Sequence, residues 1–275
     1  MPAPAPPPTQ APTPAASLWR GQLVLVACVA LACLAGIVSR PVGYLAAFWP
    51  TNAILLGLML RQPRWAASPL SWLLALLAYV AADLATGASW SVALGLNLAN
   101  VAGVAVGWWR LSRQPEDLVR LRLSRSVLYL FGACMLASLT SALLGSTVTL
   151  GSFDHDYVPS FTIWLAAEFS GYMLILPLLL AAPDGWPWRW RPDWRQHGWQ
   201  GILPLLTLVA LQAFATWYGG PGSLGFSMPA LVWCAMAYGV FAAAALNFLT
   251  GIWTIATVAM GAFSFTHDNT AAVIS

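Results

Sequence analysis

The sequence predicts an all-α fold, a polytopic transmembrane bundle of eight to nine membrane helices. Hydrophobic residues make up 59% of its 275 residues and charged residues only 8%, whereas a soluble domain is typically about 25% charged. Apolar runs of eighteen residues or more recur along the chain, and each can cross the ~30 Å hydrocarbon core as a helix. A transmembrane β-barrel would need alternating apolar and polar residues, which these runs lack.

Three parts are expected along the chain. Residues 1–17 begin with a run of Pro, Ala, Thr and Gln, which predicts an extended and disordered tail. Residues 18–263 hold all the apolar runs and form the transmembrane domain. Residues 264–275 form a short tail, which we interpret as ending before a final helix.

The first seven spans follow from the apolar runs in chain order. Pro50 lies inside the second span and is expected to kink it. A basic loop, 111–125, follows the fourth span, and a Trp/Arg-rich loop, 183–200, follows the sixth. The expected spans are 18–38, 43–60, 69–86, 92–110, 126–150, 161–182 and 201–218.

The last apolar stretch, 226–263, is too long for one span. Its 38 residues would make a helix of ~57 Å, so we expect it to break near Gly239. The break gives a short eighth helix begun by Pro229 and a ninth helix at 241–263. If 226–239 only re-enters the membrane, the chain crosses eight times and its C-terminus lies on the opposite side.

Arginine predicts the orientation. All 12 basic residues are arginine, and with a cytoplasmic N-terminus only Arg40 falls in an outside loop. This bias is typical of a multi-pass protein of the bacterial inner membrane. The net charge of +3 therefore reports orientation in the lipid bilayer and does not indicate nucleic acid as a partner.

Ionisable and amide side chains inside the spans are the candidate site residues, because they are costly in hydrocarbon. Glu168 and Asp83 both fall in the outer half of the predicted bundle, where they could line one ligand or signal pocket. The alternative is interhelical hydrogen bonding that only holds the bundle together. The full candidate set is Trp49, Asn52, Asp83, Asn97, Asn100, Glu168 and Asn247.

A weaker candidate is a metal site in the acidic outer loop. Asp154, His155 and Asp156 offer oxygen and imidazole ligands, but adjacent residues in a short loop rarely converge on one ion. A solvated turn is the favoured interpretation. No cofactor is expected, and no pairing of a nucleophile with a base indicates a catalytic site.

Two further patterns concern surfaces. Trp and Arg alternate after the sixth span and are expected to anchor the chain at the lipid headgroups. Gly103 and Gly107 allow a close approach of another helix, either in a homodimer or within the bundle. The interfacial anchors are Trp186, Trp188, Arg189, Trp190 and Arg191.

Three motifs resemble the first type of the membrane-associated sensor (MASE) family. They are FWPTNAILLG at 48–57, AADLATG at 81–87, and the run from Glu168 through Gly171 to Pro177. The resemblance covers about 18–263. It implies an integral membrane sensor domain that usually precedes a cytoplasmic GGDEF diguanylate cyclase, an EAL phosphodiesterase or a histidine kinase.

The resemblance implies that the chain senses an unidentified small ligand or membrane state and regulates a cytoplasmic signalling domain or membrane partner. The sequence holds no GGDEF, EAL or kinase motif, so the chain itself is not expected to be an enzyme, and we interpret it as a sensor module separated from its output. The alternative is a small transporter or permease in which Glu168 and Asp83 serve as coupling or substrate sites.

Overall fold

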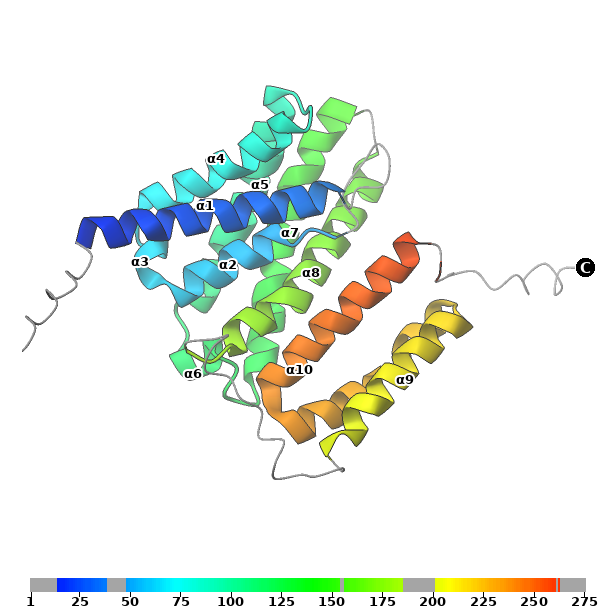
Figure 1. The fold of residues 1–275 in the computed structure, drawn as a ribbon. Coiled ribbons are helices and arrows are strands. Elements are labelled where there is room, and N and C mark those ends of the chain that lie inside the picture. Colours follow the sequence, from blue (N-terminus) through cyan, green and yellow to red (C-terminus); the bar gives the residue numbers. More distant parts are fainter. Residues whose placement is uncertain (1–13, 39–47, 154–155, 185–200, 261, 263–275) are drawn as a thin grey trace, which may run out of the picture.

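The computed structural model describes residues 14–38, 48–153, 156–184, 201–260 and 262. In these ranges the chain forms α-helices and one 3-10 helix, which confirms the predicted all-α class (Figure 1). The elements are α1 Pro14–Val38, α2 Thr51–Arg61, α3 Pro63–Ala66, α4 Pro69–Ala85, α5 Trp90–Leu111, α6 Glu116–Val119, α7 Ser126–Phe153, α8 Tyr157–Ala181, α9 Leu203–Tyr218, η3 Pro221–Gly225 and α10 Met228–Ala259.

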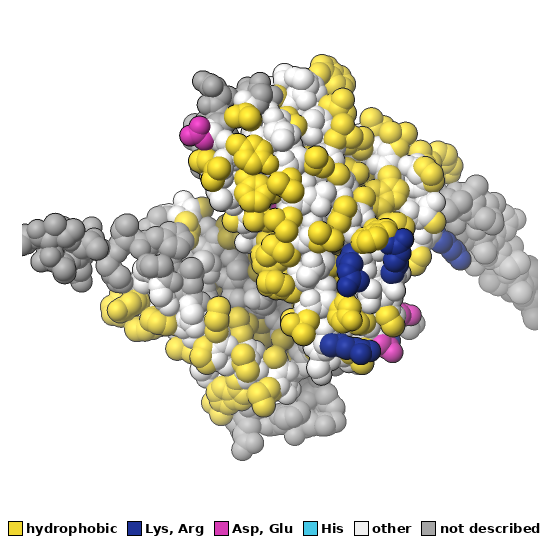
Figure 2. All heavy atoms as spheres, turned by 180° about the vertical axis from the view of Figure 1, so that it is seen from behind, with side chains coloured by type: hydrophobic (Ala, Val, Ile, Leu, Met, Phe, Trp, Pro, Cys, Tyr) yellow, Lys and Arg dark blue, Asp and Glu magenta, His cyan; other side chains and the backbone are white. Residues whose placement is uncertain are grey.

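Five of the described helices are long and apolar enough to cross a membrane, namely α1, α5, α7, α8 and α10. The apolar helices α2, α4 and α9 are shorter, with 11 to 17 residues. Large hydrophobic side chains remain exposed along most helices, and they cover much of the visible face in Figure 2. An apolar exterior of this extent indicates a multi-pass membrane protein.

Six helices share one core. Buried apolar residues of α1, α2, α4, α5, α7 and α8 form a single cluster that includes Leu25, Leu56, Tyr79, Val104 and Tyr172. Helices α9 and α10 form a smaller cluster around Leu208 and Cys234. This pair attaches to the six-helix bundle through the packing of α10 on α8 (Figure 1).

Helix bounds differ from expectation at three places. Helix α1 begins at Pro14, inside the stretch predicted to be disordered, because proline fits the first turn of a helix. Helix α8 begins at Tyr157 and α7 ends at Phe153, so the predicted acidic loop is much shorter. The basic loop contains the short helix α6.

The prediction that Pro50 kinks a continuous second span was wrong. Residues 48–50 are not helical, and α2 begins only at Thr51. Proline lacks the N–H group, and its ring also disfavours helical backbone in the residue before it. The described helix is therefore a short one that starts inside the bundle.

Gly103 and Gly107 pack within the bundle, which favours the second of the two alternatives drawn from the sequence. A Cβ on Gly103 would lie 2.8 Å from the Ala137 carbonyl oxygen of α7. A Cβ on Gly107 would lie 2.9 Å from a methyl group of Leu56 on α2. The two glycines thus bring α5 close to α7 and α2 and do not face outward as a dimer surface.

The end of α8 is capped by two arginines. Arg61 donates to the carbonyl oxygens of Leu179 and Ala182 at 2.9 and 2.6 Å, and Arg120 donates to Ala182 at 3.4 Å. The last carbonyl groups of a helix have no intrahelical partner and carry partial negative charge. Both arginines also pair with the carboxylate of Asp184. Together these contacts join α2, α8 and the loop before α7.

Helix α10 breaks at Gly239, as the sequence predicted. This residue has φ 82° and ψ 178°, a conformation that is essentially confined to glycine. Tyr238 donates to the Gly201 carbonyl oxygen at 2.5 Å, so the break lies beside the start of α9. Gln212 of α9 reaches Thr254 at 2.9 Å, which places the second half of α10 along α9 as well.

The break in α10 leads to a first prediction. Gly239→Ala should lower the free energy of unfolding by about 1–3 kcal/mol, because a residue with a Cβ rarely adopts this positive φ. The cost comes from the backbone alone, since no atom lies within 4 Å of the added Cβ. Gly132→Ala is the matched control, since Gly132 also has open space but lies in helical backbone. It should be neutral or gain up to about 1 kcal/mol. Equal thermal stability of the two variants in detergent would contradict the prediction.

A second prediction concerns pH. The hydrogen bond from Arg120 holds the pKa of Asp184 below its ordinary value of 3.8. A carboxyl group with a depressed pKa stabilises the folded state above the unfolded pKa, and the contribution is lost as the pH falls through the folded pKa. The effect should be small because Asp184 is exposed.

We therefore expect Asp184→Asn to melt slightly below the natural chain at neutral pH. The difference should shrink as the pH falls below 3.8. Thermal melting of both proteins across this range is the measurement. A difference that stays constant with pH would show that the charge of Asp184 is not its source.

Candidate functional site

Polar side chains from five helices meet in the interior of the six-helix bundle. Each is buried although its helix is largely apolar. Because α2 packs on α5 and α8, and α5 packs on α4 and α7, side chains on the facing sides of these helices can reach one another. The hydrogen-bonded set consists of Trp49 before α2, Asn52 of α2, Tyr79 and Asp83 of α4, Asn97 and Asn100 of α5, Ser141 of α7, and Trp164 and Glu168 of α8.

Asn52 lies at the centre of this carboxylate–amide network. Its Nδ2 atom donates to Glu168 Oε1 at 2.6 Å and to Asn100 Oδ1 at 3.1 Å. Its Oδ1 atom accepts from the Tyr79 hydroxyl at 2.5 Å and from Trp49 Nε1 at 3.3 Å. One amide group therefore uses both its donor and its acceptor atoms to connect α2 with α4, α5 and α8.

A chain of amides continues from Asn52 to the second carboxylate. Asn100 Nδ2 donates to Asn97 Oδ1 at 3.1 Å, and Asn97 Nδ2 donates to Asp83 Oδ2 at 2.7 Å. Each amide in the chain donates in the direction of Asp83. Glu168 and Asp83, the two acids that the sequence suggested could line one pocket, are thus connected through three asparagines, and both carboxylates are acceptors at ends of the network.

A side branch extends the network to α7. Ser141 lies 3.4 Å from Asn100 Oδ1 and accepts from Trp164 Nε1 at 3.0 Å. Gly145, one turn after Ser141, lies against the ring of Trp164. Glycine at this position leaves room for the indole, which brings α7 and α8 together beside the network.

The start of α2 points into this network. The first bond of the helix joins the Ile54 N–H group to the Pro50 carbonyl oxygen at 3.1 Å. The amide groups of 51–53 precede it and have no intrahelical acceptor. The N-terminal end of a helix carries partial positive charge, which favours a nearby carboxylate such as Glu168. Proline at position 50 thus creates an electropositive helix end where the buried acid lies.

The network lies about midway along the six-helix bundle. Arg61 lies nine positions after Asn52 along α2, a distance of ~14 Å at 1.5 Å per residue. The hydrocarbon core is ~30 Å thick. Since Arg61 reaches the end of α8, Asn52 and Glu168 lie roughly midway between the two ends of the bundle.

Three buried oxygen atoms next to this network's residues have no hydrogen-bond partner among the described residues. They are Glu168 Oε2, the hydroxyl of Thr51 and the hydroxyl of Tyr172. An unsatisfied buried polar group is costly and is normally paired with ordered water or a ligand. Glu168 can therefore accept a proton, a water molecule or a donor group of a small ligand without breaking its bond to Asn52.

Sequence reasoning found most members and missed others. Tyr79, Ser141 and Trp164 were not predicted. Tyr79 lies four residues before Asp83, and Trp164 and Tyr172 lie four residues on either side of Glu168, so each shares a helix face with a buried acid. That spacing was a usable signal. Ser141 carried none, because a serine in an apolar helix is common.

Asn247 does not join the network in the structure. It lies half-buried on α10, which packs on the outside of α8, and among the described residues no hydrogen bond connects it with the other candidates. Trp49, by contrast, is a member. The pocket role predicted for these residues stays a prediction.

The remaining candidates lie mostly outside the described residues. This holds for Asp154 and His155 and for all the predicted interfacial anchors at 186–191. Asp156 immediately precedes α8. Within the described ranges no three His, Cys, Asp or Glu side chains group as metal ligands, so the metal hypothesis stays untested at 154 and 155.

Two curated relatives are similar to the chain, and both are described as probable diguanylate cyclase DgcF. The protein from Escherichia coli O157:H7 is 29% identical over 250 residues, which are 88% of this chain and 50% of the relative. The protein from Escherichia coli strain K12 is 35% identical over 98 residues, which are 35% of this chain and 29% of the relative. The chain spans half or less of their length. No family model and no solved structure matches it.

The network leads to a third prediction. Asn52→Ala should lower the free energy of unfolding by about 2 kcal/mol, because four interhelical or helix-end hydrogen bonds are lost and each is worth roughly 0.6 kcal/mol in a membrane bundle. Asn247→Ala is the matched control and should change stability by less than about 0.5 kcal/mol. Unfolding in mixed micelles measures both. An equal effect of the two substitutions would contradict the geometry.

Proposed function

We propose that the chain is the membrane-embedded sensor module of a cyclic di-GMP signalling protein in a bacterial inner membrane. The observation that carries the proposal is the similarity of 88% of this chain to half of a probable diguanylate cyclase. The described part of the chain consists mainly of apolar helices, whereas a cyclase needs a water-exposed nucleotide site. The MASE-like motifs support the same assignment, and 18–263 would be the sensor domain.

The carboxylate–amide network is the proposed signal site. Glu168 is the best candidate for its central residue, because it is a buried acid with one oxygen unpaired among the described residues. A ligand or a proton that reaches this oxygen would change the strength of the bond to Asn52. Any signal must bind two arrangements of the bundle with different affinity in order to shift the equilibrium between them.

Helix α2 offers a direct path from this site to the end of the bundle. One end holds Asn52 and the other holds Arg61, which bonds to the last turn of α8 and to Asp184. The basic end, with the N-terminus, would be cytoplasmic by the arginine bias. A small displacement of α2 at Glu168 would therefore change contacts where a cytoplasmic output domain or partner would receive the signal.

The proposal predicts the effect of Glu168→Gln on output. The chain would be fused in place of the matching half of the relative from Escherichia coli O157:H7, and cyclic di-GMP would be measured in cells. Glutamine keeps the shape and an acceptor for Asn52 but removes the titratable group. We expect the cyclic di-GMP level to change at least about threefold, a shift of under 1 kcal/mol in a two-state equilibrium.

Asn247→Ala serves as the matched control and should leave output unchanged, and membrane insertion should be equal in all three proteins. Unaltered cyclic di-GMP with Glu168→Gln would remove the network from the sensing role. Uptake of a labelled solute into vesicles that Glu168→Gln abolishes would favour the transporter alternative instead.

A further inference from the structure

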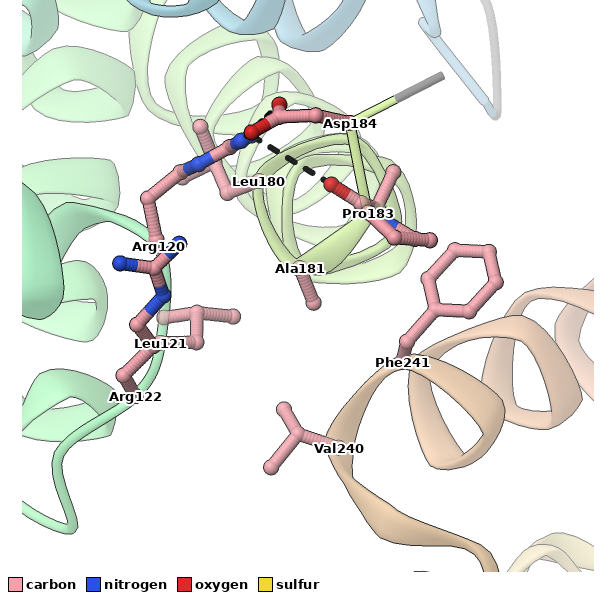
Figure 3. Close-up of a pocket in the computed structure, with 10 residues that line it drawn as sticks. Arg120, Leu121, Arg122, Leu180, Ala181, Pro183, Asp184, Val240 and Phe241 are labelled. Atoms are coloured by element: carbon pink, nitrogen blue, oxygen red, sulfur yellow. Dashed lines mark hydrogen bonds and ion pairs between the residues drawn. The ribbon is translucent and has the colours of Figure 1, made fainter. Parts of the chain in front are cut away.

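A pocket lies at the arginine-bearing end of the bundle, away from the carboxylate–amide network. Its volume is about 430 Å³. Figure 3 shows its three walls: the loop before α7 with Arg120 and Arg122, the end of α8 with Leu180 and Asp184, and the break in α10. The pocket is therefore built where a loop, the end of one helix and the break in another meet, and two arginines line one side.

Two unusual backbone conformations shape this pocket. Leu121 has φ 57°, and among the described residues it alone has a positive φ without being glycine. Leucine rarely adopts this conformation, so the surrounding fold must impose it. Its side chain is buried, and both neighbours, Arg120 and Arg122, line the pocket. Gly239, also at positive φ, precedes the wall residue Val240 on the opposite side.

The basic wall already binds one anionic group. Asp184 accepts from Arg120 and, at 3.3 Å, from Arg61. Its side chain is 79% exposed, so it can leave at low cost. Arg122 is 55% exposed and pairs with Asp117 at 2.9 Å outside the pocket lining. The arrangement offers guanidinium groups to an anion, and phosphate oxygens match their geometry at least as well as a carboxylate does.

The apolar wall favours an amphiphilic ligand. Val240 and Phe241 line the side opposite the arginines, on the α10 segment across the pocket in Figure 3. Leu180 adds an apolar side chain from the end of α8. The pocket lies level with the last residues of α8, where a membrane helix meets the lipid headgroups. Basic pockets between transmembrane helices at this level suit anionic lipid headgroups.

We propose that this pocket binds the phosphate group of an anionic phospholipid. Arg122 and Arg120 contact the phosphate, Phe241 and Val240 contact the glycerol and the start of the acyl chains, and Asp184 competes with the lipid for the arginines. The ligand links α8, α10 and the loop before α7. This inference does not depend on the proposed sensor function.

The test uses the full chain purified in a zwitterionic detergent. Binding of phosphatidylglycerol would be measured by native mass spectrometry, with zwitterionic phosphatidylcholine, which has no net charge, as the control and inorganic phosphate as a separate arm. We expect phosphatidylglycerol to bind and phosphatidylcholine to bind at least tenfold more weakly. Binding of inorganic phosphate with the same affinity as the lipid would overturn the lipid assignment.

Three variants decide whether the pocket is the site. Arg122→Gln should weaken phosphatidylglycerol binding about fivefold, the effect of one basic residue near a membrane surface. Asp184→Asn should strengthen it, because the competing carboxylate is gone. Arg113→Gln is the control, since Arg113 lies in the same basic loop but stacks on Trp109 outside the pocket. It should have no effect.

The signs of these effects separate the proposal from general attraction to the membrane. Equal weakening by Arg113→Gln and Arg122→Gln would overturn the pocket as a specific site. Weaker binding in Asp184→Asn would also overturn it, because the aspartate would then support the lipid site and not compete with it. Arg120 is left unchanged in the test, since it caps α8.

Discussion

The cost of placing Asn52 and Glu168 in the interior of an apolar bundle constrains the rest of this structure. Neither side chain can be left without partners in hydrocarbon. Asn52 meets this constraint with partners from α4, α5 and α8 and from the segment before its own helix. Any arrangement that separated these helices would leave several polar groups unpaired. The network therefore specifies which helices are neighbours and how far each is shifted along its axis relative to the others.

Glycines let the helices approach closely enough for the buried polar side chains to find partners. The backbone at Gly171, three residues after Glu168, lies against the Trp49 carbonyl oxygen, where a Cβ would come within 2.5 Å. Gly103 and Gly107 likewise let α5 approach α7 and α2. Short amide side chains can bridge helices only when the backbones are this close. Apolar packing and the polar network therefore depend on the same close approaches.

Helix α2 connects the two polar regions of the molecule. Pro50 makes it start inside the bundle, beside Glu168, and Arg61 ends it among the last carbonyl groups of α8. A helix of only 11 residues thus carries a polar contact at each end and an apolar core contact between them. In a sensor module, a rigid element with these two attachments is a physical means of coupling the interior to one surface.

The sequence by itself determined the all-α class, most helix bounds, the break at Gly239 and the identity of the buried acids, because these depend on local hydropathy, on backbone preferences and on the cost of charge in hydrocarbon. It also indicated that Asp83 and Glu168 could line one pocket, which stays a prediction. Only the tertiary structure decided that three asparagines connect them, that Asn247 lies apart, and that α2 starts after Pro50 as a short helix. The reason is that rotation of each helix about its axis selects the partners of a side chain, and packing between helices distant in the sequence fixes that rotation.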